Sequence, residues 1–110
     1  MQLPMVLREY ERKVLALLVP MGLVAKQTLD SVEFVSLEHT GNGYFLTVKH
    51  PALPLAPLTC HEPFVVGRDR SLAVGFVAYL GERELLLECH GLGDPVPQDV
   101  RERDLAVSVA

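Results

Sequence analysis

Two Cys-His dipeptides, Cys60-His61 and Cys89-His90, combine residue types that could do chemistry. Thiolate and imidazole are common ligands of zinc, which needs about four of them in a tetrahedral arrangement. Adjacent residues on a β-strand point to opposite faces of a sheet, so each dipeptide offers one ligand unless the backbone is irregular there. A metal site at these pairs is therefore an alternative hypothesis, and the favoured interpretation needs no metal or other cofactor.

Glu88 and His90 form a second candidate, because residues two apart on a strand share a face. A carboxylate beside an imidazole raises the histidine pKa and can support proton transfer. The small residues Gly75 and Ala73, predicted on the facing strand, leave space above this pair. Together with Asp94, the pair predicts a cleft for a small molecule, in a binding protein or an enzyme, as another alternative.

Known catalytic patterns give no support for an enzyme. The sequence contains no G-x-S-x-G, H-E-x-x-H or C-x-x-C motif, and its glycine-rich pieces do not have phosphate-loop spacing. The interpretation therefore leans away from enzymatic activity.

Length and composition fit one globular α+β domain over residues 1–110. A chain of 110 residues that is 49% hydrophobic and 22% charged can bury a core large enough to fold without disulfides or metal. Ten Lys and Arg against fourteen Asp and Glu give a formal charge of −4. A chain with this charge balance lacks the basic surface that binds a phosphate backbone, so no nucleic-acid partner is expected.

The longest apolar run, residues 14–25, has twelve residues, whereas a membrane-spanning helix needs about 20. The run has the length of a signal-peptide core, but Glu9 and Glu11 precede it and its apolar residues have helical spacing. Two cysteines are too few for a disulfide framework and are expected as buried thiols. We therefore expect a cytoplasmic protein without a membrane partner.

The chain is predicted to begin with an amphipathic helix. Apolar residues three or four apart predict its buried face: Leu3, Val6, Leu7, Tyr10, Val14, Leu17 and Leu18. Charged residues predict its solvated side: Arg8, Glu9, Glu11, Arg12 and Lys13. Pro4 fits the first helical turn, and Pro20 and Gly22 end the helix.

The remaining residues predict a mostly antiparallel sheet of five to six strands, on which the helix packs. Strand signals cover residues 32–39, 44–50, 62–67, 72–80 and 83–90, with a last strand at Leu105, Val107 and Val109. Gly41-Asn42-Gly43 and Gly81-Glu82 are predicted hairpin turns, the second of type II′. A change of apolar phase within residues 32–39 predicts a β-bulge. Residues 51–57 are predicted to form a proline-rich loop, and residues 23–31 a short helical turn.

Pairing Leu80 with Arg83 in the second hairpin assigns each side chain to a face and sets Phe76 opposite Leu87. The core face is predicted to hold Leu72, Val74, Phe76, Ala78, Leu80, Leu85, Leu87 and Cys89. The other face holds Ala73, Gly75, Val77, Tyr79, Glu84, Leu86, Glu88 and His90. This second face is too apolar for a solvated one, so we expect another segment, a second subunit or a ligand to cover it.

Two stretches resemble a group of small uncharacterised bacterial proteins. Residues 40–48, TGNGYFLTV, resemble the "TGxGFFTxF" strand of that group. Residues 75–79, GFVAY, followed by Leu87-Glu88 and by GDPVP at 93–97, resemble its "GFVLF…LEGYTYGDxxWP" segment. The chain departs from the pattern at residues 89–92, CHGL in place of the aromatic GYTY, and at Val96 in place of tryptophan. The resemblance implies a bacterial cytosolic protein of undefined function, in a group sometimes encoded near toxin–immunity or similar loci, and it does not imply any enzyme activity.

The favoured interpretation is a non-enzymatic interaction or regulatory module, immunity-like in character. It would act through the sheet face that carries Val77, Tyr79, Leu86, Glu88 and His90. Its partner would be another protein or a second copy of the chain, as a homodimer.

Overall fold

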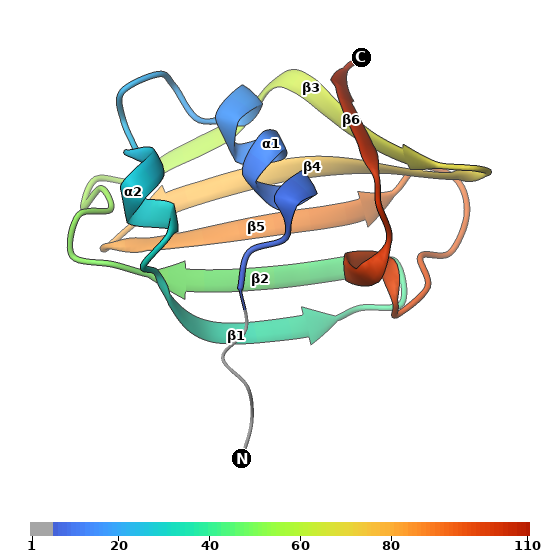
Figure 1. Cartoon of the computed structure of the whole chain (residues 1–110), viewed down its shortest axis with the longest axis horizontal. Coiled ribbons are helices and arrows are strands. Elements are labelled where there is room, and N and C mark those ends of the chain that lie inside the picture. The colour runs from blue at the N-terminus through green and yellow to red at the C-terminus, as the bar shows by residue number, and fades with distance from the viewer. Residues whose placement is uncertain (1–5) are drawn as a thin grey trace.

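The computed structural model describes residues 6–110, which form one layer of short helices against one β-sheet (Figure 1). The helices are α1 (Glu9–Leu18), α2 (Lys26–Leu29) and the 3₁₀ turn η1 (Val100–Glu102). The strands are β1 (Glu33–His39), β2 (Gly43–Lys49), β3 (Leu58–Asp69), β4 (Leu72–Gly81), β5 (Glu84–Gly91) and β6 (Ala106–Val109). The predicted α+β class, an N-terminal helix packed on an antiparallel sheet, is confirmed.

The strand order across the sheet is β1-β2-β5-β4-β3-β6, and every neighbouring pair is antiparallel. The β4–β5 hairpin therefore lies in the middle, with β2 on one side and β3 on the other. The predicted last strand, β6, adds to the outer side of β3. The candidate site residues of β4 and β5 therefore have neighbours on four strands, β2, β5, β4 and β3.

Helix α1 ends at Leu18, just before Pro20 and Gly22, as predicted. Proline lacks the N–H that would continue the helix, and Gly22 has a φ of 83° that favours glycine. The predicted roles of Leu3 and Pro4 lie outside the described residues.

The buried side of α1 differs from the predicted one. Its buried residues, Tyr10, Glu11, Val14, Leu15 and Leu18, form one arc on a helix that turns 100° per residue. Glu11 lies inside this arc and is fully buried, so its predicted place on the solvated side is wrong.

Two apolar residues assigned to the buried stripe are exposed. Leu17 lies at the margin of the buried arc and is 40% exposed, and Val6 precedes the first turn and is 64% exposed. The prediction included these two residues because apolar spacing alone does not show whether another part of the fold packs against each position.

The first predicted hairpin and bulge are both present. Strands β1 and β2 pair in antiparallel fashion across the predicted turn, and their register shifts between Phe34 and Ser36. Gly43, which has a φ of 141°, faces the backbone of β5, and a Cβ there would collide with the carbonyl oxygen of Cys89. Only glycine therefore allows β2 and β5 to pair this closely at that end.

The predicted turn between β4 and β5 is wrong. Gly81 pairs with Glu84, and the turn residues are Glu82 and Arg83, with φ of 53° and 64°. Two consecutive positive φ values are those of a type I′ turn rather than type II′. The pairing of Leu80 with Arg83 is thus also wrong, and the register is displaced by two residues. A displacement of two leaves every side chain on its predicted face.

The proline-rich loop at residues 51–57 explains this turn. The backbone N–H groups of Glu82 and Arg83 donate to the carbonyl oxygens of Leu55 and Pro54, at 2.9 and 3.0 Å. The Arg83 guanidinium also donates to the carbonyl oxygen of Leu53, at 3.0 Å. These bonds hold the turn from outside the hairpin, which hairpin rules cannot anticipate.

Strand β3 begins at Leu58, earlier than the predicted strand at residues 62–67. Its pairing with β4 is interrupted between Cys60 and Val65, where the Glu62–Pro63 peptide bond is cis. The expected helical turn within residues 23–31 is present as α2.

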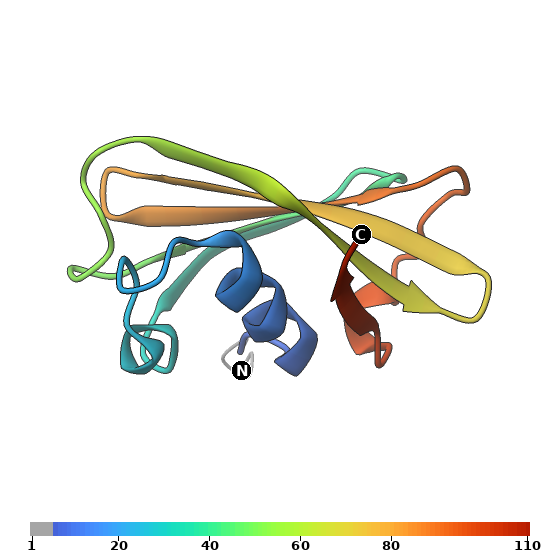
Figure 2. The ribbon, with the colours of Figure 1, turned by 90° about the horizontal axis from the view of Figure 1, so that it is seen from above.

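The predicted core face of the β4–β5 hairpin is confirmed, since each of its eight residues is buried. Helix α1 packs on this face, and Figure 2 shows α1, α2 and η1 on the same side of the sheet. Within residues 6–110, none of the helices has the length and apolar character that crossing a membrane requires.

Candidate functional site

The sheet face opposite α1 is bare. Figure 2 shows no element of residues 6–110 on this side of the sheet. We call it the open face and define it by its central residues: Phe45, Phe64, Val77, Tyr79, Leu86, Glu88 and His90. We expected another segment of the chain, a second subunit or a ligand to cover this face. Within the described residues, no other segment of the chain covers it.

Three predicted site residues are in contact on the open face. The Tyr79 hydroxyl donates a hydrogen bond to Glu88 Oε1 at 3.1 Å, and His90 Nδ1 lies 3.4 Å from Glu88 Oε2. Partial desolvation and the hydrogen bond to Glu88 raise the pKa of Tyr79. Glu88 of β5 thus lies between the Tyr79 hydroxyl of β4 and the His90 ring of β5, and all three side chains are partly exposed.

Gly75 provides the space that His90 occupies. A Cβ at Gly75 would lie 2.7 Å from His90 Nε2 and 2.8 Å from Phe64 Cε1. Atoms of both rings therefore take up the space beside a residue without a side chain. The space predicted above Gly75 is filled by the protein's own rings rather than left for a ligand.

Val77 and Leu86 are half-buried between these polar groups. Val77 pairs with Glu88 across the β4–β5 ladder, and Leu86 pairs with Tyr79 on one side and Thr47 on the other. Phe64 is 47% and Tyr79 39% exposed. The centre of the open face is thus an apolar and aromatic surface that also contains the polar groups of Glu88, His90 and the Tyr79 hydroxyl.

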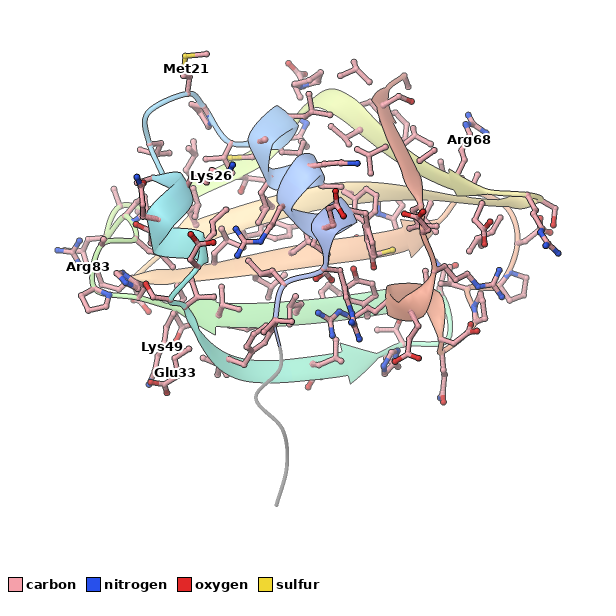
Figure 3. All side chains as sticks on the ribbon, in the orientation of Figure 1. Met21, Lys26, Glu33, Lys49, Arg68 and Arg83 are labelled. Carbon is pink, nitrogen blue, oxygen red and sulfur yellow. The ribbon has the colours of Figure 1, made fainter. Side chains whose placement is uncertain are left out.

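Charged residues mark the rim of the open face. Lys49 of β2 lies 3.3 Å from Glu33 of β1 at one edge, where Figure 3 shows the two side chains together. Glu84 is exposed at the start of β5, and Arg68 near the end of β3. An apolar centre with a polar rim is the usual anatomy of a protein–protein interface.

Asp94 does not join this group. It lies in the loop after β5, where its carbonyl oxygen would be 2.5 Å from a Cβ at Gly91 on the side facing the buried Val96. The loop therefore bends towards the covered side of the sheet. Within the described residues, no contact joins the Asp94 side chain to Glu88 or His90.

A shallow cleft of about 540 Å³ adjoins the open face near the β4–β5 turn. It is lined by Tyr79 and Leu86 with Leu55 and Pro57 of the proline-rich loop, and not by Glu88 or His90. This cleft is therefore not the one that the acid–base hypothesis requires, which would be lined by Glu88, His90 and Asp94.

The two Cys-His dipeptides are not brought together. Cys60 pairs with Ala78 of β4 and Cys89 with Phe76, and both thiols are buried on the core face. Burial raises the pKa of both thiols, that of Cys89 to about 12, so they are poor ligands and nucleophiles at neutral pH. Within residues 6–110, no three His, Cys, Asp or Glu side chains are grouped so as to hold a metal.

A second polar cluster lies inside the core. We call Tyr10, Glu11, Tyr44 and Arg101 the buried network. Arg101 donates to both carboxylate oxygens of Glu11, from Nε at 2.8 Å and Nη2 at 2.9 Å. The Tyr44 hydroxyl donates to Glu11 Oε2 at 2.6 Å and lies 2.6 Å from the Tyr10 hydroxyl. Since a hydroxyl has one proton, Tyr10 must donate to Tyr44.

The buried network joins parts of the chain that are far apart in sequence. It connects α1 to β2 and, through Arg101, to η1 near the C-terminus. Arg101 also donates to the carbonyl oxygen of Val6 at 3.0 Å. Glu11 completes its bonds by accepting the backbone N–H of Arg8 at 2.7 Å. Because Glu11 is fully buried and Arg101 nearly so, this cluster serves the fold rather than a substrate.

The environment of the network shifts the pKa values of Arg101 and of the two tyrosines. Burial by itself lowers the pKa of Arg101, but the hydrogen bond and charge of Glu11 outweigh this and raise it. Burial and the Glu11 charge raise the pKa of both tyrosines, so they remain neutral hydrogen-bond donors.

Sequence reasoning placed Tyr10 on the buried side of the helix but missed the hydrogen bonds of the buried network and the position of Phe64. Phe64 lies in the predicted strand at residues 62–67, to which the prediction assigned no face. Glu11 and Arg101 stood in charged stretches typical of solvent-exposed surface, and they are separated by 90 positions. No alternation could have placed Phe64 on this face, because Phe64, Val65 and Val66 are consecutive apolar residues and the register of β3 shifts between Cys60 and Val65.

Comparisons with protein-family models, with curated proteins and with solved structures return no match for this chain. The resemblance to the group of small bacterial proteins therefore stays a prediction.

Proposed function

We propose that this protein is a non-enzymatic interaction module that forms a homodimer through its open face. The observation that carries this proposal is a bare face of a six-stranded sheet with two exposed aromatic side chains, Phe64 and Tyr79. Antiparallel sheets often leave one face to solvent, but such a face is normally polar. An apolar patch of this kind marks an interaction surface.

The size of the open face suits a second copy. The five spacings between six strands, at about 4.8 Å each, and strands of about eight residues, at about 3.4 Å per residue, give a face of roughly 600–700 Å². Two such faces together would bury roughly 1,200–1,400 Å², which lies in the range of stable protein interfaces. The Cα extents of 38 × 38 × 20 Å describe a flat molecule, for which this face is the largest bare surface of the sheet.

The chemistry of the face also suits a second copy. Two sheets stacked about a two-fold axis would bring the apolar and aromatic centre of each copy against that of the other, as in a β-sandwich core. The partly exposed Glu88 already accepts a hydrogen bond from the Tyr79 hydroxyl within one copy. Its burial in an interface would therefore not leave the carboxylate without a hydrogen-bond donor.

Sedimentation equilibrium of the unmodified protein tests the proposal. The chain has a mass of 12.2 kDa, and a dimer has about twice that mass. We expect the dimer mass at about 100 µM and a shift towards the monomer on dilution to about 1 µM, as mass action requires. A monomer mass at every concentration would contradict self-association.

A further inference from the structure

A cleft of about 500 Å³ lies on the other side of the molecule, between α1, α2 and the segment 19–25 that joins them. Figure 1 shows the two helices next to each other over the same sheet face, with this segment arching between them. The buried Leu85 of β5 contributes to its lining from the sheet side. The volume falls within the range of small-molecule sites in proteins.

The walls of this cleft are apolar. Leu15, Ala16 and Val19 line it from α1 and the residue after it, and Val24 and Leu29 line it from the α2 side. Val19, Val24 and Leu29 are half-buried, so part of their apolar surface is in contact with water. A ligand bound in the cleft would remove that surface from water, which is favourable.

The rim of the cleft carries charges of both signs, with Arg12, Lys13, Lys26 and the carboxylate residue Glu9 among its lining residues. Arg12 closes one end, because it binds Asp30 at 2.7 Å and reaches the carbonyl oxygen of Leu29 at 3.4 Å. Lys13 is engaged by Glu9 at 3.8 Å. Within residues 6–110, Lys26 has no carboxylate at ion-pair distance.

We propose that this cleft binds one anionic amphiphile, a free carboxylate with an unbranched apolar chain. The chain would lie along the apolar walls, and the carboxylate would pair with Lys26 at the rim. Charge complementarity selects the anion, because Lys26 sits beside apolar surface, whereas the two other lining cations, Arg12 and Lys13, are already paired with carboxylates. This site is separate from the open face and does not depend on the homodimer.

Calorimetric titration with sodium decanoate below its micelle concentration tests the site. We expect saturable binding of one decanoate per chain, and far weaker binding of decyltrimethylammonium, which has the same chain and the opposite charge. Lys26→Glu should weaken decanoate binding about five- to tenfold, since it removes one exposed ion pair and adds a repulsion. It should also strengthen binding of the cationic probe. Lys26→Gln, which removes the charge without reversing it, should give an intermediate effect.

Two further variants separate charge from shape. Arg68→Glu makes the same change in net charge at the far end of the molecule from Lys26, as Figure 3 shows, and should leave decanoate binding unchanged. Ala16→Trp should place an indole in the cleft and abolish binding of both probes while the far-ultraviolet spectrum stays native. Equal binding of the two probes to the unmodified protein would overturn the proposal. So would equal effects of Lys26→Glu and Arg68→Glu, or binding to anionic vesicles without binding to free decanoate.

Discussion

Arg101→Met is expected to lower the free energy of unfolding by about 3–5 kcal/mol, because it leaves the Glu11 carboxylate buried without its counter-ion. Glu11 is fully buried, and both hydrogen bonds from Arg101 to its oxygens are shorter than 3.0 Å. Methionine fills much of the same volume, so the loss is one of charge pairing rather than of packing. Urea unfolding followed by circular dichroism measures the effect.

Arg103→Met is the matched control, two residues further along the chain. Arg103 is one-third exposed and contacts Asp69 and Asp99 at 3.4 Å, so this change should cost less than about 1 kcal/mol. The double variant Glu11→Met with Arg101→Met should recover much of the lost stability, because no charge is then buried alone. An Arg101→Met variant as stable as Arg103→Met would contradict the structural role of the buried network.

Leu86→Glu is expected to abolish the homodimer, with a dissociation constant raised by at least about 100-fold. Leu86 is at the centre of the open face, and Glu84 and Glu88 lie on the same face two residues before and after it. A third carboxylate would be desolvated in the interface without a partner, which costs several kcal/mol. In a two-fold symmetric dimer the same change occurs twice. Sedimentation equilibrium should then give the monomer mass at concentrations where the unmodified protein is a dimer.

Leu17→Glu provides the control for this change. Leu17 is also a surface leucine, 40% exposed, but it lies on α1, away from the open face. This variant should keep the dimer mass, and both variants should keep the native far-ultraviolet spectrum. A dimeric Leu86→Glu variant, or equal dissociation of the two variants, would exclude the open face as the interface.

The sequence predicts the faces of this sheet better than its pairing. Alternation in β4 and β5 has a period of two, so a register error of two residues moves Leu80 from Arg83 to Leu85 without turning any side chain over. Val77, Tyr79, Leu86, Glu88 and His90 were therefore assigned correctly to one face, although the turn that joins their strands was not. The turn depends on hydrogen bonds from the proline-rich loop, which a hairpin rule does not include.

Contacts between distant segments could not be predicted in the same way. The burial of Glu11 depends on Arg101 arriving from the opposite end of the chain, and neither residue carries a local signal of that pairing. Asp94 was grouped with Glu88 and His90 by closeness in sequence, but its loop bends to the covered side. Phe64 lies beside Gly75, as His90 does, but the early start of β3 and its interrupted pairing with β4 break the alternation that would have assigned Phe64 to a face.

The most direct test of the homodimer is an isotope-filtered nuclear Overhauser experiment on a mixture of labelled and unlabelled chains. It detects only protons from different copies that lie close together. We predict cross-peaks between copies for the side chains of Phe64, Val77, Tyr79 and Leu86, and none for residues of α1. Cross-peaks from α1 or from the edge strand β1 alone, or none in a sample with the dimer mass, would contradict association through the open face.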